Sequence, residues 1–183
     1  MRFAFLTLAA CVLASSATEA RVAPYSATVT APSRDAVRLR AVMLDMHNQA
    51  RIRVGERPLA WDPQLAASAA SYADWLRRSG RFEHSEQSTS DDAQGENLWM
   101  GTRGAFSFEQ MADGWIEEQR HYRPAPVPAS STTGRWSDVA HYTQVVWQDA
   151  TAMGCAIAST DEDDILVCRY SPPGNVVGEM PYR

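Results

Sequence analysis

Two short apolar segments near the C-terminus, within residues 154–170, constrain the fold of this chain more than any other feature. They read "GCAIAST" and "ILVCRY", and the acidic turn "DEDD" lies between them. A two-residue turn that pairs Thr160 with Asp163 makes them a β-hairpin. In that register Cys155 stands opposite Cys168. Opposed Cβ atoms in a sheet are about 4.5–5.5 Å apart and a disulfide needs about 3.5–4.5 Å, so a bridge forms with slight tightening. Asp-Glu is not a favoured two-residue turn, which leaves a slipped register open.

Three segments before the hairpin have the apolar spacing of amphipathic helices. We expect helices over residues 33–54, 62–80 and 107–124. Asp62 is a good N-cap for the second helix, and Pro124 stops the third. Helices first and strands later are typical of an α+β fold, in which helices and a sheet form separate layers.

Two further segments are apolar without a helical period. "GENLWMG" (95–101) is bracketed by glycines, and we expect a short buried strand or a tight loop. "TQVVW" (143–147) is apolar at consecutive positions, which we interpret as a strand covered on both faces. His141 then stands just before that strand.

The N-terminal residues differ in kind from the rest. Residues 1–20 combine an early arginine, a short apolar run and small residues, which is typical of a signal peptide. "LAAC" (8–11) also resembles a bacterial lipoprotein cleavage box, although the apolar run is short for one. Residues 21–33 are small, polar and proline-bearing, and we expect a linker or loose tail. The remaining residues, 34–183, are expected to form one domain.

The signal peptide bears on how the cysteines and charges are interpreted. Cleavage removes Cys11 and leaves Cys155 and Cys168, an even count that favours a disulfide in an oxidising compartment. No apolar run is long enough to span a bilayer. The 17 basic residues are all arginine and scattered, and the formal net charge is −5, so no nucleic-acid footprint is present. We expect a secreted protein, or a periplasmic one in a bacterium.

A carboxylate on an apolar helix face is the first candidate for chemistry, because its burial needs a reason. In the third helix, steps of four, three and four residues connect Met111, Trp115, Glu118 and Tyr122. This spacing puts Glu118 on the apolar face, whereas Glu117 falls off it. The alternative is a boundary glutamate that reaches solvent at the edge of the stripe.

A second glutamate and the four histidines complete the candidate set. Glu96 lies inside "GENLWMG" and is expected to be half-buried. His84 precedes a polar loop and is expected to be accessible, and His141 is the other candidate. His47 is interpreted as a hydrogen-bonded core histidine, and His121, near a helix end, as a surface residue.

Two imidazoles and two carboxylates are able to bind a divalent metal such as zinc. From His84 through Glu96 and Glu118 to His141 the spacings are 12, 22 and 23 residues, which match no local zinc motif. The sequence also has no H-E-x-x-H motif, nucleophile elbow or phosphate loop. Spacing alone leaves open whether the four side chains meet.

Several motifs occur in an order that resembles one family. They are "HNQARIRVGERPLAWDPQLAASAASYADWL", "HS" with "GENLW", the Trp, Glu and Tyr of the third helix, "HYTQVVW" and "CRYSPPGNVVGEMPY". Together they resemble the CAP superfamily of cysteine-rich secretory proteins, antigen 5 and pathogenesis-related 1 proteins, also called the SCP domain. The resemblance covers about residues 36–182, and "HYTQVVW" and "PPGN" are its most specific parts.

The resemblance implies a three-layer α-β-α sandwich with a central antiparallel sheet and a cleft. It also implies that the two histidines bind zinc with the two glutamates nearby. These four residues fall on His84, Glu96, Glu118 and His141. Two features depart from the family pattern. Ala140 stands where glycine usually precedes the second histidine, and only one candidate disulfide pair is present.

For function, the resemblance implies three classes. The first is an extracellular ligand-binding module, with a lipid or sterol as the ligand and a metal in the cleft. The second is a module that binds an extracellular protein or a cell-wall component. The third is a metal-dependent hydrolase or protease, in which Glu96 or Glu118 is the general base for a zinc-bound water. We expect binding rather than catalysis, because two protein ligands are in view and catalytic zinc usually has three.

Overall fold

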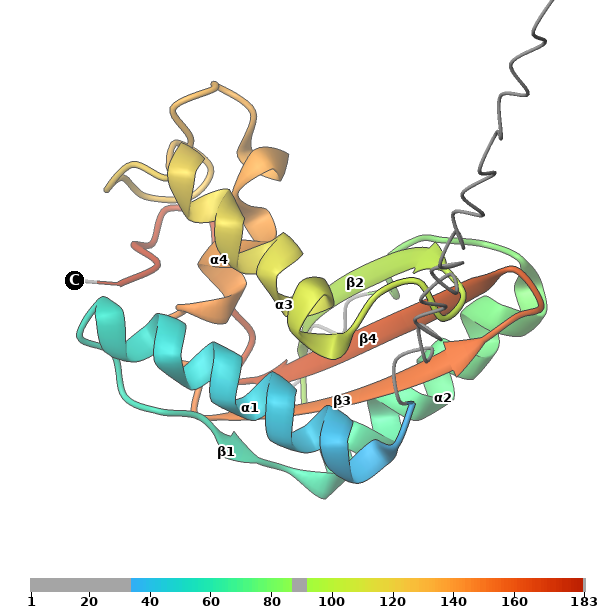
Figure 1. Cartoon of the computed structure of the whole chain (residues 1–183). Coiled ribbons are helices and arrows are strands. Elements are labelled where there is room, and N and C mark those ends of the chain that lie inside the picture. Colours follow the sequence, from blue (N-terminus) through green and yellow to red (C-terminus); the bar gives the residue numbers. More distant parts are fainter. Residues whose placement is uncertain (1–33, 87–91, 183) are drawn as a thin grey trace, which may run out of the picture. The chain divides into compact units, whose positions relative to one another are not determined.

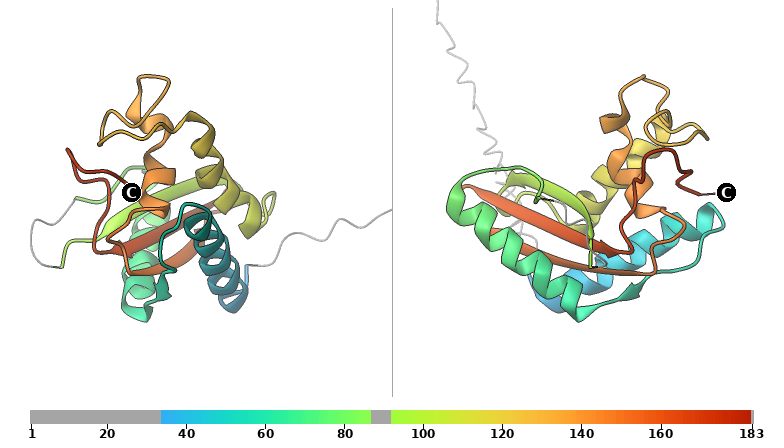
Figure 2. Two further views of the ribbon diagram at one scale, coloured as in Figure 1. Left: turned by 90° about the vertical axis from the view of Figure 1, so that its left-hand side faces the viewer. Right: turned by 180° about the vertical axis from the view of Figure 1, so that it is seen from behind.

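The computed structural model describes residues 34–86 and 92–182, which form a three-layer α+β sandwich (Figures 1 and 2). The helices are α1 (Ala36–Arg53), α2 (Pro63–Ser79), α3 (Phe108–Ile116) and α4 (Ala140–Val145), with 3₁₀ helices η1 (Glu117–His121) and η2 (Trp136–Asp138). The strands are β1 (Ala60–Trp61), β2 (Gly95–Thr102), β3 (Ala152–Ser159) and β4 (Asp163–Ser171). The predicted signal peptide, 1–20, and tail, 21–33, lie outside the described residues.

The sheet has the strand order β1-β3-β4-β2 and separates two apolar clusters. The larger cluster joins α1, α3 and α4 to one face of the sheet, and the smaller joins α2 to the opposite face. The predicted layers are therefore confirmed. Within the two described ranges, no helix is long and apolar enough to cross a membrane.

The ends of the second helix lie where the sequence predicts them. Asp62 accepts a hydrogen bond from the Gln64 amide (2.7 Å) at the start of α2. α2 ends at Gly80, whose φ of 66° is the left-handed conformation that favours glycine. The helices predicted over 33–54 and 62–80 are confirmed.

The third helix is shorter than its predicted range of 107–124. The capping box at Ser107 is present, but α3 gives way to the tighter η1 after Ile116. Glu118 lies in η1 and is half-buried, whereas Glu117 beside it is exposed. Glu118 is therefore the internal glutamate of the two, as the helical spacing predicts.

The C-terminal hairpin forms in the predicted register. Cys155 faces Cys168 across β3 and β4, and the two form a disulfide. The Thr160 amide donates to the Asp163 carbonyl (2.8 Å), which closes the turn. β2 pairs antiparallel with β4, so "GENLWMG" is a strand. β1 pairs with β3 in parallel over two residues, so the sheet is mixed at that edge.

Residues 143–147 do not form the predicted strand, and this expectation was wrong. The segment instead runs from the short helix α4 into the turn after it. Tyr142 to Val145 are all buried, because α1, α3, η1, η2 and β2 pack around this helix. A short apolar run does not distinguish a buried helix from a buried strand. His141 therefore stands in the first turn of a helix. Ala140 before it is the first residue of that helix, where alanine fits as well as the glycine that is usual in the family.

His47 is a core histidine, as predicted. Its side chain is buried in α1, where Nδ1 lies 2.7 Å from the Met43 carbonyl oxygen and Nε2 lies 2.8 Å from the Tyr170 hydroxyl. Burial lowers the pKa of His47 from 6.5 to about 4, and the charge of Arg51 adds to this effect, while the hydrogen bond with Met43 opposes it. His47 is therefore neutral in the folded chain at neutral pH.

We expect His47 to make the protein less stable as the pH falls from about 6.5 toward 4. In this range the unfolded chain binds a proton that the folded chain excludes. The contribution of His47 is therefore complete above pH 6.5 and is lost as the pH approaches 4. The loss corresponds to about 3 kcal/mol of unfolding free energy. Urea unfolding at about pH 7 and about pH 4.5 measures it. His47→Gln, which does not titrate, is expected to lose clearly less, and an equal loss would contradict the role of His47.

Candidate functional site

A cavity of about 530 Å³ lies between β2, α4 and the loop after β4, and we call it the cleft. Its lining includes His84, Glu96 and His141. The fold therefore brings three of the four predicted site residues to one cavity, and Glu118 contacts His141 from η1.

The first pair joins His84 to Glu96. His84 Nδ1 lies 2.7 Å from Glu96 Oε1, and the amide and hydroxyl of Ser85 donate to the same carboxylate. Arg169 forms an ion pair with Glu96 Oε2 at 2.8 Å. Burial opposes ionisation of Glu96, but the hydrogen bond from His84 and the charge of Arg169 outweigh it and lower its pKa. Glu96 is thus an ionised, buried anchor for an imidazole whose side chain is 59% exposed.

The second pair joins His141 to Glu118. His141 Nδ1 lies 2.6 Å from Glu118 Oε1. Glu118 Oε2 accepts hydrogen bonds from the backbone amides of His141 (3.0 Å) and Tyr142 (3.1 Å) at the start of α4. The Trp115 ring stacks on the imidazole, with the ring centroids 6.1 Å apart and the planes inclined by 20°. The Glu118 carboxylate and the Trp115 ring therefore together fix the orientation of the His141 imidazole.

Both pairs leave the same atom of the imidazole available. A carboxylate beside Nδ1 holds the proton on that nitrogen, so Nε2 keeps its lone pair. Metal-binding histidines in proteins are commonly held in this way, with the second ring nitrogen donating to a carboxylate. Glu96 and Glu118 thus fit as residues that orient the imidazoles rather than as further ligands.

The donor set offers a metal ion two imidazole nitrogens. Residues 34–86 and 92–182 contain no group of three or more His, Cys, Asp or Glu side chains arranged to hold a metal. His84 and His141 would supply the two protein ligands, and water or a bound ligand would complete the coordination.

Two asparagines that the sequence analysis missed fix the backbone around His141. Asn97 on β2 donates to the His141 carbonyl (3.1 Å). Asn175 donates to the Ala140 carbonyl (2.9 Å) and accepts a hydrogen bond from the Thr143 hydroxyl (2.6 Å). Asn175 has a φ of 61°, which asparagine tolerates better than most residues. The "PPGN" motif was the available signal, because asparagine after glycine is typical of a turn.

Sequence comparisons identify the family of this chain. Residues 44–170 match the family described as CAP, the cysteine-rich secretory protein family. Pathogenesis-related protein 1C of Nicotiana tabacum is 37% identical over 140 residues, which are 76% of this chain and 78% of the relative. Pathogenesis-related protein 1 of Arabidopsis thaliana is 39% identical, over 76% of this chain and 80% of the relative.

Structural comparisons agree with the sequence. The crystal structure of NaASP2 with Zn²⁺ superimposes with a TM-score of 0.67 and 26% identity, covering 85% of this chain and 88% of NaASP2. The hookworm platelet inhibitor has a TM-score of 0.63 over 82% of this chain and 78% of its own, and at 18% identity it supports the fold alone. The fold, the motifs and the comparisons agree, and this chain belongs to the cysteine-rich secretory protein (CAP) family.

Proposed function

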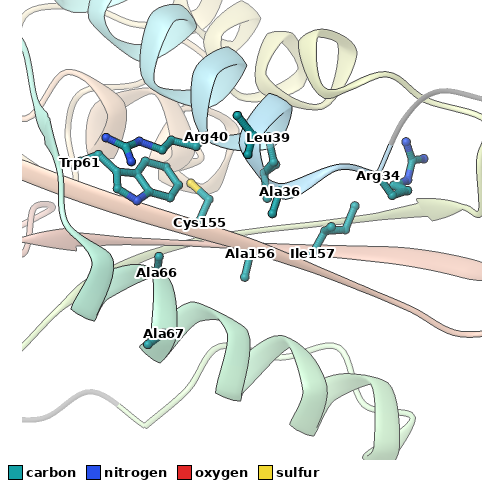
Figure 3. A pocket seen from close by; sticks show the side chains of 11 residues that line it. Arg34, Ala36, Leu39, Arg40, Trp61, Ala66, Ala67, Cys155, Ala156 and Ile157 are labelled. Carbon is teal, nitrogen blue, oxygen red and sulfur yellow. The ribbon is translucent and has the colours of Figure 1, made fainter.

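We propose that this chain is an exported ligand-binding module that carries an anionic lipid. The supporting observation is an apolar groove of about 520 Å³ between α1 and α2 (Figure 3). Apolar side chains from four elements line it, including Leu39, Trp61, Ala66 and Ile157. A concavity of this size and composition is typical of small-molecule sites, and an acyl chain gains free energy by leaving water there.

Two arginines border the groove and indicate the charge of its ligand. Arg34 forms an ion pair with the buried carboxylate of Asp164. Arg40 is exposed, and its guanidinium lies 5.7 Å from the centre of the Trp61 ring. In the part of the chain that the structure describes, Arg40 has no ion-pair partner. An uncompensated cation beside an apolar groove complements the carboxylate of a fatty acid, which a neutral sterol lacks.

The proposal includes a metal in the cleft and export from the cell. His84 and His141 would hold a divalent cation such as zinc through Nε2, and the cation would supply a positive centre for a ligand atom. The 26% identity to NaASP2, whose crystal structure contains Zn²⁺, supports this part. The predicted signal peptide, the disulfide and the description of the family as secretory support export.

Palmitate binding tests the groove. We expect saturable binding that persists when a chelator is present, because the groove and the cleft are lined by different residues. Ala67→Trp places an indole in the groove from an exposed position on α2 and is expected to abolish binding. Arg40→Glu is expected to weaken binding by about tenfold or more, because it replaces an attraction with a repulsion.

The matched control is Arg53→Glu, which makes the same charge change at the opposite end of α1. Its palmitate affinity is expected to equal that of the unmodified protein. If both groove variants also kept full affinity, the lipid would not lie in this groove and the proposal would fail.

A further inference from the structure

The amide of Gln144 is buried at the wall of the cleft, and in the described part of the chain its oxygen is hydrogen-bonded while its NH₂ group is not. Gln144 is 1% exposed, and its Oε1 accepts a hydrogen bond from the Gly174 amide at 3.1 Å. This contact fixes which end of the amide is oxygen, because an N–H needs an acceptor. Nε2 has no hydrogen-bond partner among the residues described.

Two glycines make room for this amide. A Cβ built on Gly95 would lie 2.3 Å from Gln144 Oε1, and a Cβ built on Gly174 would lie 2.7 Å from Gln144 Nε2. Both glycines line the cleft, as does Gln144 itself. The amide is therefore held between two backbone segments at the cavity wall.

A second buried donor lines the same cleft. The indole Nε1 of Trp136 is also buried without a hydrogen-bond partner in the described ranges. Buried N–H groups are normally paired, because an unmade hydrogen bond costs free energy. Gln144 and Trp136 supply the two buried lining atoms that lack a partner in the described part of the chain, and both atoms are donors. A ligand that pairs with these two donors has to offer acceptor atoms.

The two glutamates of the site are already paired within the protein, so the donors of Gln144 and Trp136, unpaired among the described residues, are left for an acceptor from outside it. The carboxylate of Glu96 is compensated by Arg169, and that of Glu118 accepts three N–H groups. The two glutamates are therefore already engaged, and the imidazole Nε2 atoms attract a cation that would itself bind an anion. A carboxylate offers two acceptor oxygens and one negative charge to this environment.

We propose that the cleft binds a carboxylate, one oxygen of which accepts a hydrogen bond from Gln144 Nε2, with Trp136 Nε1 as the second donor. This inference rests on the proposed binding function and gives the chemistry of the ligand at the cleft, which is separate from the groove. The carboxylate belongs either to a small organic acid or to the C-terminus of a peptide.

Nuclear magnetic resonance of the full exported chain tests this proposal at the atom concerned. The side-chain NH₂ signals of Gln144 are identified by their loss in Gln144→Glu. On titration with acetate we expect these signals to shift saturably, and we expect no shift with methyl acetate, which has no charge. An acetylated dipeptide with a free C-terminus probes the peptide source, and whichever probe binds more tightly identifies the source. Gln144 signals that stay still with both carboxylates would overturn the proposal.

Gln144→Glu also tests the donor by affinity. It keeps the shape of the side chain and the acceptor for Gly174, removes the N–H donor and adds a negative charge, so acetate should bind about tenfold more weakly or worse. Gln64→Glu makes the same charge change at an exposed position and is expected to bind acetate normally. Equal acetate affinity in a folded Gln144→Glu would contradict the role of Gln144.

Failure of the carboxylate site and failure of the proposed function give different results. The titrations are run with excess chelator and with zinc. If the carboxylate probes shift the Gln144 signals but zinc does not bind, the carboxylate site is supported and the metal part of the proposed function fails. If zinc or palmitate binds but neither carboxylate probe shifts the Gln144 signals, the carboxylate site is refuted and the proposed function is not.

Discussion

Replacing Gly154 with alanine is expected to destabilise the fold by about 3 kcal/mol or more. Gly154 lies in β3 where the start of α2 crosses the sheet. A Cβ at this position would lie 2.2 Å from the Ala66 amide nitrogen and 2.6 Å from the Asp62 carbonyl oxygen. Both are backbone atoms, so no side chain can rotate away, and the first turn of α2 must move off the strand. A loss of this size is a large fraction of the stability of an ordinary domain, which is about 5–15 kcal/mol.

The matched control is the same substitution at Gly114 in α3. There the nearest atom to an added Cβ is 3.9 Å away, so the methyl group meets no obstacle. Alanine is the better helix former, and we expect stabilisation by about 0.5–1 kcal/mol. Urea unfolding of the two variants measures both effects. Equal stability of Gly154→Ala and the unmodified protein would show that α2 does not pack against β3 as closely as described.

The second large effect is expected at the imidazole pair. Alanine at both His84 and His141 should abolish zinc binding, because no other pair of imidazoles is held by carboxylates within residues 34–86 and 92–182. Each single variant should bind zinc far more weakly than the unmodified protein. Because protons compete with a metal for the imidazole nitrogens, zinc affinity should also fall as the solution is made more acidic. Calorimetric titration with zinc measures all of these.

Controls separate the ligands from the residues that orient them. Glu96→Gln and Glu118→Gln should lower zinc affinity by about 10–100-fold without abolishing it, as expected for partners of metal-binding histidines. His121→Ala removes a histidine whose Nε2 accepts a hydrogen bond from Arg120 outside the cleft, and zinc binding should be unchanged. Full zinc affinity in the double histidine variant would place the metal elsewhere.

The parts of the fold that the sequence predicts are those set by local signals. The N-cap at Asp62, the left-handed glycine at the end of α2 and the turn between β3 and β4 act over a few residues, and each lies where expected. α4 was missed because its burial comes from elements far away in the sequence. Four consecutive residues of α4, Tyr142 to Val145, are buried and leave no exposed face there, so the helical period is not visible in the sequence.

The candidate site also has features that local sequence signals predict and features that they do not. The inward position of Glu118 followed from helical spacing alone, although the chain there is a 3₁₀ helix. The meeting of His84 and His141 required the resemblance, since the two lie on different segments. A role for Gln144 in the cleft was not predicted, because residues 143–147 were interpreted as a buried strand. Its partners, Gly95 and Gly174, are remote in sequence, and nothing in the sequence links these glycines to it.

The central claim is that the exported protein carries an anionic lipid in the groove between α1 and α2. Native mass spectrometry of the protein, purified from the medium or the periplasm and treated with a chelator, tests this most directly. We predict a bound species with the mass of a fatty acid that is absent from Ala67→Trp. A protein that carries no such species, and that does not take up added palmitate, would contradict the account.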